Sequence, residues 1–197
     1  MRDLKTKKEV IAVDNGKDSY ARFLSGDESG LVEIVREYKD GLMLYINGFV
    51  HNIHLAEELT EDVFVKLGVK KPKDKGGSHF KTWLYTIARH TAIDCLRKIA
   101  RSRTVPLEDC ADLSAECESA EMTYFREHRK RTIHRAMGRL RSEYRQALWL
   151  VYFESFSYQQ VAKIMGKSVH SVETLVYRAR RSLKAELEKE GFVYENL

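Results

Sequence analysis

Apolar residues recur at steps of three and four along most of the chain, which is the periodicity of amphipathic helices. In the first half, one apolar stripe runs from Leu31 to Phe49, a second from Leu55 to Leu67 and a third from Phe80 to Cys95. In the second half, a stripe from Ile133 to Val151 predicts one further amphipathic helix. No sustained period-two alternation bounded by turns occurs, so the pattern predicts an all-α fold.

The residues from Ser157 to Lys184 have the spacing of a helix-turn-helix motif. Ser157 and Gln160 form a capping box that predicts the start of a short first helix. Three later positions provide a small residue where the helices approach, a glycine for the turn and an apolar anchor, which are Ala162, Gly166 and Val172. A plain helical hairpin could share this spacing, but a dense cluster of basic residues at the end of the motif favours DNA binding.

The second helix of this motif would enter a major groove, with its first turns at base edges and its later arginines on phosphates. Ser168 and Ser171 are both candidate N-caps for it. The residues that we expect to contact duplex DNA are Ser168, His170, Ser171, Glu173, Thr174, Tyr177, Arg178 and Arg181.

The charge distribution divides the chain. The net charge is only +5, but residues 66–81 hold six lysines against one acid, and residues 89–103 hold five basic residues against one acid. Residues 104–125 then hold six acids and no lysine or arginine. A proline-containing acidic stretch between two basic, periodic segments predicts an inter-domain linker.

The expected organisation is therefore two small helical domains joined by an acidic linker, with a helix-turn-helix in the C-terminal domain. The boundaries that we predict are a tail at 1–19, a first domain at 20–103, the linker at 104–125, a second domain at 126–186 and a tail at 187–197.

The second half resembles a known family. Gly166–Leu183 resembles the closing helix of the extracytoplasmic-function (ECF) sigma factors, and Arg145–Ala162 resembles the helix pair that precedes it. In the first half, Ala56–Phe64 is similar to the polymerase-docking helix of that family, and Phe80–Arg97 is similar to its promoter-melting helix. The resemblance covers roughly residues 20–185, with the motifs in the expected order.

The resemblance implies a division of labour between the domains. The N-terminal domain would bind the clamp of core RNA polymerase and capture the melted strand of the minus-ten element. The C-terminal domain would bind the minus-thirty-five element as duplex DNA and would also contact the flap of the polymerase. The resemblance further implies an anti-sigma factor as a partner.

A melted strand needs cations for its phosphates and flat side chains for its unstacked bases. The residues that we expect to hold it are Lys73, Lys75, Lys81, Trp83, Arg89, His90, Arg97, Lys98 and Arg101. The competing interpretation places Trp83 in the domain core, because aromatic side chains of small domains usually bury. Members of the family commonly carry asparagine where this chain has His90, which puts a specific hydrogen bond from that position in doubt.

The segment Ala56–Phe64 carries an acidic face. Alone, such a face would be a solvated helix surface, but the resemblance implies that it docks onto a basic element of the polymerase. The expected polymerase contacts are Glu57, Glu58, Leu59, Glu61, Asp62 and Phe64, with the two apolar residues as core or edge contacts.

Two other classes of function compete with this interpretation. A one-component regulator would also end in a helix-turn-helix, but it needs no melting helix. An enzyme acting on nucleic acid is disfavoured, because the acids cluster away from the basic segments and no phosphate-cradling glycine loop or metal-ligand spacing is present. We therefore expect no catalytic residues, no metal and no cofactor.

The cysteines and the hydropathy add little. Cys95, Cys110 and Cys117 lack the spacing of metal ligands, and no apolar run approaches the length of a membrane span. The expectation is a cytoplasmic protein that makes no membrane contact of its own and does not form homo-oligomers.

Overall fold

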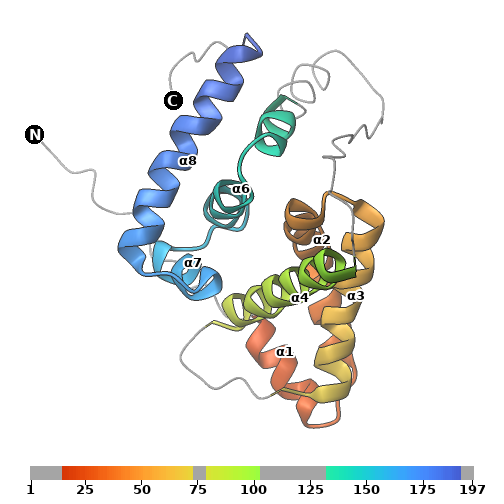
Figure 1. Cartoon of the computed structure of the whole chain (residues 1–197). Helices are drawn as coiled ribbons and strands as arrows, with labels where there is room; N and C mark the ends of the chain where they lie inside the picture. The colour runs from red at the N-terminus through yellow and green to blue at the C-terminus, as the bar shows by residue number, and fades with distance from the viewer. Residues whose placement is uncertain (1–14, 73–78, 103–131, 192–197) are drawn as a thin grey trace, which may run out of the picture.

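The computed structural model describes residues 15–72, 79–102 and 132–191. Within these residues every regular element is helical and no strand occurs, so the all-α prediction is confirmed (Figure 1). The first group of helices comprises α1 (Asn15–Leu24), α2 (Ser29–Val50), α3 (Ile53–Lys70) and α4 (Phe80–Ser102). The second group comprises a helical segment at 132–138, α6 (Ser142–Leu148), the π-helix η1 (Trp149–Phe153), α7 (Tyr158–Met165) and α8 (Val169–Lys189).

The first group packs around the three apolar stripes of the sequence. Ile34, Leu42 and Ile46 of α2 are fully buried, and they meet the buried faces of α3 and α4. Helix α3 begins where Asn52 leaves the helical conformation and accepts a hydrogen bond from the Leu55 amide at 3.1 Å. An asparagine at this position satisfies a backbone donor that the helix itself cannot, which fixes where the helix starts.

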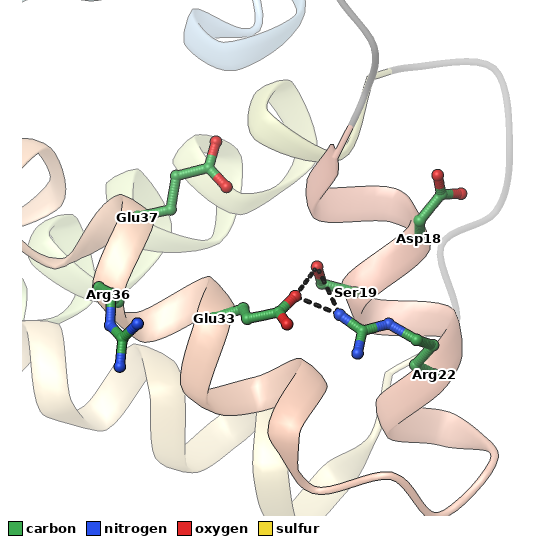
Figure 2. Close-up of a pocket in the computed structure, with 6 residues that line it drawn as sticks. All are labelled: Asp18, Ser19, Arg22, Glu33, Arg36 and Glu37. Atoms are coloured by element: carbon green, nitrogen blue, oxygen red, sulfur yellow. Dashed lines mark hydrogen bonds and ion pairs between the residues drawn. The ribbon is translucent and has the colours of Figure 1, made fainter.

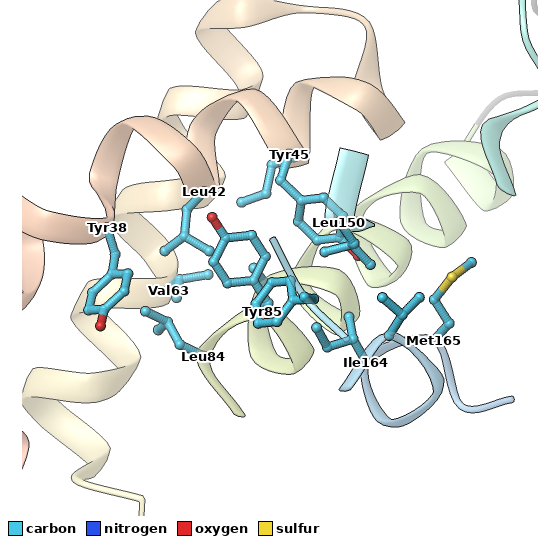
Figure 3. Close-up of a cluster of buried hydrophobic side chains, with 14 of the residues drawn as sticks. Tyr38, Leu42, Tyr45, Val63, Leu84, Tyr85, Leu150, Ile164 and Met165 are labelled. Carbon is cyan, nitrogen blue, oxygen red and sulfur yellow. The ribbon is translucent and has the colours of Figure 1, made fainter. Parts of the chain in front are cut away.

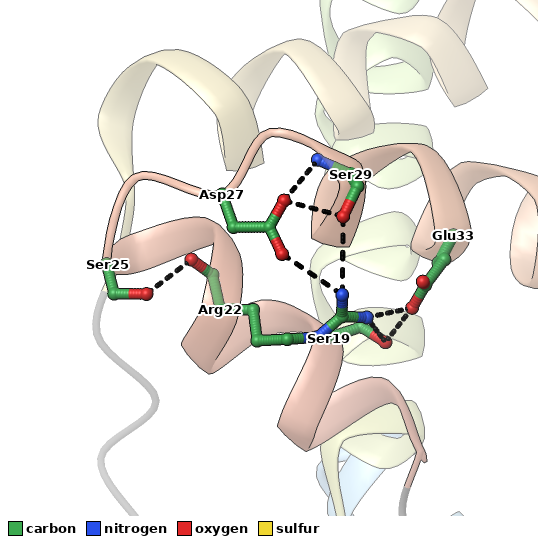
Figure 4. A network of polar contacts seen from close by, with 6 residues as sticks. All are labelled: Ser19, Arg22, Ser25, Asp27, Ser29 and Glu33. Carbon is green, nitrogen blue, oxygen red and sulfur yellow. Dashed lines mark hydrogen bonds and ion pairs between the residues drawn. The ribbon is translucent and has the colours of Figure 1, made fainter.

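Helices α1 and α2 form a tight hairpin tied by a polar network (Figure 4). Arg22 contacts Asp27 at 3.1 Å and also pairs with Glu33, while Asp27 accepts from the backbone amide and the hydroxyl of Ser29. Figure 2 shows that two of these side chains, Arg22 and Glu33, also line a cleft between the two helices. The cleft has a volume of about 440 Å³. Arg22 and Glu33 pair with each other in this cleft. These residues therefore hold the α1–α2 hairpin together, and their charges are already paired.

Helices extend into both ranges that were predicted to be tails. Helix α1 begins at Asn15, because Tyr20 and Phe23 bury against the core and hold the whole helix. At the other end, α8 continues to Lys189, since Leu187 is buried and Arg139 pairs with Glu190 at 2.8 Å. The acidic linker predicted at 104–125 lies outside the described residues.

The stripe that predicted one helix from Ile133 to Val151 is divided in the structure. A turn at residues 139–140 separates the helical segment 132–138 from α6, so the prediction of a single helix is wrong. The side chain of Arg145 compensates for the break. Its guanidinium donates to the carbonyls of Met137, Gly138 and Leu140 at 2.8–3.0 Å, which satisfies acceptors that a continuous helix would have paired internally.

The two groups of helices share one hydrophobic core. Helix α7 packs against α4, and α6 packs against α2. Figure 3 shows Leu150, Ile164 and Met165 of the second group beside Tyr45 and Tyr85 of the first. Whether the domains touch could not be derived from the sequence, and in this structure they do.

Candidate nucleic-acid interface

The helix-turn-helix predicted from the sequence is present in detail. The Ser157 hydroxyl accepts from the Gln160 amide at 3.3 Å and the Gln160 side chain accepts from the Ser157 amide at 2.8 Å, so the capping box is complete. Gly166 ends α7 in the left-handed conformation, with φ of 63°, where a side chain would be strained. Ala162 and Val172 are buried at the crossing of the two helices, as their sizes predicted.

Helix α8 presents a polar face to solvent. The Ser168 hydroxyl accepts from the Ser171 amide at 3.1 Å, which identifies Ser168 as the N-cap. Tyr177 is 62% exposed, although it is aromatic, so its ring is available to a partner. The other expected contacts with exposed side chains are Ser168, His170, Ser171, Glu173, Arg178 and Arg181, and Thr174 is half-buried with its hydroxyl donating to the His170 carbonyl.

The structure adds residues beside this face that were not among the expected contacts. A cleft of about 620 Å³ separates the start of α6 from the recognition helix. Arg141 and Tyr144 line one side, and His170, Thr174 and Arg178 line the other. Arg141 is exposed, so it adds a cation beside the recognition helix although it lies outside the helix-turn-helix motif. No local motif in the sequence indicated this position, because only tertiary packing brings it beside α8.

Helix α4 carries the cations expected to hold a melted strand. His90, Arg97, Lys98 and Arg101 are exposed, and Arg97 pairs loosely with Asp94 at 3.4 Å. From residue 90 to residue 101 the helix rises about 17 Å, enough for several phosphates of a single strand. Of the remaining expected contacts, Lys73 and Lys75 lie outside the described residues.

Three other residues of this set are less accessible. Trp83 is half-buried, with its ring centroid 5.4 Å from that of Tyr20 and 5.6 Å from that of Phe80, so it packs with the core. The Arg89 side chain is half-buried, and its Nε atom is fully covered. Lys81 is engaged by Glu154 of the other domain at 2.9 Å. In this arrangement of the domains, the later basic residues of α4 are exposed, whereas Lys81 is paired with a residue of the other domain.

The acidic face of α3 is exposed where the sequence placed it. The carboxylates of Glu58, Glu61 and Asp62 are at the surface, while Glu57 pairs with Lys39 of α2 at 3.4 Å. Leu59 and Phe64 are buried in the domain core, so they support this face from below. The surface that could meet a basic partner is therefore formed by the acids.

The described residues contain no cluster of histidine, cysteine and carboxylate side chains that could hold a metal ion. Cys95 is a free, half-buried thiol, and the other two cysteines are outside the described ranges. Among the helices at 15–72, 79–102 and 132–191, none combines the length and the hydrophobicity that crossing a membrane requires.

Both halves of the chain match family models. The Sigma-70 region 2 model matches residues 34–103, and the Sigma-70 region 4 model matches residues 130–183. The RNA polymerase sigma-H factor of Pseudomonas aeruginosa is 30% identical, over 91% of this chain and 97% of that protein. The RNA polymerase sigma factor YlaC of Bacillus subtilis is 28% identical, over 80% of this chain and 91% of that protein.

Solved structures show the same architecture. The sigma factor RpoE from Bartonella quintana, in complex with the anti-sigma factor NepR, covers 79% of this chain and 97% of its own, with 26% identity and a TM-score of 0.61. CnrH, in complex with the cytosolic domain of CnrY, shares the fold at 19% identity with a TM-score of 0.63, over 89% of this chain and 98% of its own. Two family regions in order, together with a relative similar along nearly its whole length, show that this chain belongs to the ECF sigma factors, the RNA polymerase subunits for promoter recognition and transcription initiation.

Proposed function

We propose that the recognition helix α8 binds the minus-thirty-five element as duplex DNA. His170, Ser171, Thr174 and Tyr177 would contact base edges, and the basic residues that follow would contact phosphates. The exposed polar face of α8, on a complete helix-turn-helix, is the single observation that supports this proposal best. Glu173 faces His170 at 3.7 Å, so the pair could present a donor and an acceptor together.

The melted minus-ten strand would lie along α4. The exposed basic side chains of this helix form a cationic surface for phosphates. Such a surface supplies affinity for DNA without reading its sequence. His90 is exposed among them and would contribute stacking or a hydrogen bond. Trp83 would instead hold the start of α4 against α1, because its ring packs on Tyr20 and Phe80.

Core RNA polymerase would bind the acidic face of α3 through a basic element of its clamp. Glu58, Glu61 and Asp62 project together from one side of that helix, with buried residues behind them. Complementary charge of this kind orients a partner and speeds its association. The C-terminal domain would make a second contact, to the flap.

An anti-sigma factor is a further proposed partner. The RpoE relative was solved in complex with such a factor, and it is similar to most of this chain. The protein would act by binding, without catalysis or a cofactor. It would work in the cytoplasm as a single copy, without a membrane contact of its own.

Reconstitution tests this function directly. Purified full-length chain is added to core RNA polymerase with a library of genomic promoter fragments, and run-off transcripts are sequenced. We expect new start sites that depend on the chain and that share a minus-thirty-five and a minus-ten sequence. Transcripts identical to those of core polymerase alone would refute the proposal. A chain that shifts duplex DNA but never associates with polymerase would favour a one-component regulator.

A further inference from the structure

A carboxylate of the C-terminal domain lies against three residues of the N-terminal domain. We call these residues, Gly41, Lys81 and Tyr85, the socket. Glu154 follows η1, and only 11% of its side chain is exposed. Its Oε2 lies 2.9 Å from Lys81 Nζ, its main-chain carbonyl accepts from the same Lys81 ammonium at 3.0 Å, and its carboxylate accepts from the Tyr85 hydroxyl. Burial, and then the adjacent Glu154 charge, raise the pKa of the Tyr85 phenol far above its ordinary value, so this hydroxyl stays a donor.

The socket depends on a glycine inside α2. A Cβ on Gly41 would lie 2.7 Å from the Tyr85 hydroxyl oxygen and 2.9 Å from Glu154 Oε1, closer than side chains tolerate. Glycine in the middle of a helix lowers its stability relative to alanine. The approach of Glu154 and Tyr85 therefore explains why this position has no side chain.

The backbone around Glu154 bends so that this segment contacts the N-terminal domain. Ser155 has φ of 58°, a left-handed conformation that is costly for a residue other than glycine, and it lies two residues after the end of the π-helix. Phe156 then turns back onto α4, where its ring centroid lies 5.1 Å from that of Tyr85. Nearby, Arg145 donates to the Gly48 carbonyl at 3.2 Å and meets the ring of His51. Polar and aromatic contacts thus join the two domains at several points.

This contact covers part of one DNA-binding surface and leaves the other open. Lys81 begins the cationic track of α4, and in this arrangement Glu154 neutralises its charge, while a third of the Lys81 side chain stays exposed. The recognition face of α8 remains exposed. The packed arrangement would therefore allow duplex contact but weaken capture of a melted strand.

The packed arrangement is also too small for a promoter. The two elements are centred about 25 base pairs apart, which is about 85 Å of B-form DNA. A compact chain of this length has a radius of gyration of about 16 Å, so its diameter is about 40 Å. The domains must separate before α8 and α4 can engage both elements.

We infer that Glu154, seated in the socket of Gly41, Lys81 and Tyr85, is an autoinhibitory latch that keeps the two domains of the free chain together. This inference rests on the proposed function, because it assigns Lys81 to the melted strand. Polymerase binding would hold the domains apart and release Lys81. Free chain would therefore bind single-stranded DNA poorly until it is assembled with polymerase.

Two substitutions should disrupt the latch, one by charge repulsion and one by filling the socket. Glu154→Lys places two ammonium groups together, and its control is Glu188→Lys, an equal charge change at an exposed residue that pairs only loosely with Lys184 at 3.7 Å. Gly41→Ala fills the socket without changing charge, and its control is Gly68→Ala, where a Cβ meets Leu31 only at an ordinary 3.4 Å. The readouts on the full chain are the radius of gyration from small-angle X-ray scattering and the affinity for a labelled single-stranded 20-mer.

We expect both latch variants to have a larger radius of gyration than their controls. They should bind the 20-mer at least about fivefold more tightly, since apparent affinity falls with the fraction of chain that is competent to bind. Values equal to those of the controls in both variants would refute the latch. If wild-type chain gives no run-off transcripts with polymerase, the proposed function fails, whereas the scattering comparison still decides whether the domains are latched.

Discussion

Arg145 ties the break in the C-terminal domain to the end of α2. Its side chain is 9% exposed, and burial lowers the pKa of its guanidinium. It remains charged and donates to carbonyls of three residues around the break at 139–141 and to Gly48. Because truncation would leave several carbonyls without donors, we expect Arg145→Ala to lower the free energy of unfolding by about 2–4 kcal/mol. Urea titration followed by circular dichroism measures this.

Arg139 is the matched control for that change. It is half-exposed and pairs with Glu190 at 2.8 Å, so Arg139→Ala should cost about 1 kcal/mol or less. An equal loss in the two variants would mean that the buried carbonyl network contributes nothing beyond a surface ion pair.

Asp27 gives the α1–α2 hairpin a dependence on pH. Hydrogen bonds from Ser29, followed by the charge of Arg22, hold the pKa of this carboxyl below its ordinary value of 3.8. Its contribution to stability is therefore complete above that value and is lost as the pH falls through the lower pKa of the folded state. We expect wild type to lose stability more steeply than Asp27→Asn below about pH 4. Urea midpoints measured against pH test this, and parallel curves would contradict it.

At the scale of the element, the proposed binding of α8 to duplex DNA assigns affinity and specificity to different residues of the helix. Arg178→Ala should weaken binding to all duplex sequences alike and reduce the slope of log affinity against log salt by about one, because one phosphate contact is lost. His170→Ala and Thr174→Ala should instead change which minus-thirty-five sequences are selected. Selection from a random duplex library, with Lys189→Ala as the charge control, measures both effects. Unchanged preference in the His170 and Thr174 variants would place base contacts elsewhere on α8.

Elements followed from the sequence wherever local signals were sufficient. The capping box and the left-handed Gly166 fixed the bounds of α7. The capping box pairs backbone amides at the start of the helix, and the glycine permits the left-handed conformation at its end. The break at 139–141 could not be foreseen, since the apolar stripe continues through it and an arginine elsewhere in the chain satisfies the freed carbonyls. The start of α1 was missed for a similar reason, because tertiary burial of Tyr20 and Phe23 holds it.

At the scale of the whole molecule, the sequence predicted which surfaces carry charge but not how the domains meet. Most acidic residues of α3 and most basic residues of α4 and α8 are exposed as their helical positions indicated. Glu154 looked like an ordinary surface acid, and Lys81 looked like one more cation of the track. Only the packing of α7 on α4 brings these two residues together, and no periodicity along the chain encodes a contact between residues so far apart.

The proposed docking of polymerase on the acidic face of α3 is tested by reversing the charge of that face and measuring assembly of the complex. Glu58 and Asp62 are exposed and lie one helical turn apart, so Glu58→Lys with Asp62→Lys should keep the fold but abolish co-purification with core polymerase. The same reversal at Glu143 and Glu188 of the C-terminal domain alters net charge equally and should leave assembly intact. Circular dichroism confirms that both double variants are folded. Because the α3 variant retains both DNA-binding helices, it should still bind promoter duplex through α8 while supporting no transcription. Normal holoenzyme formation by this variant would show that the polymerase docks on another surface.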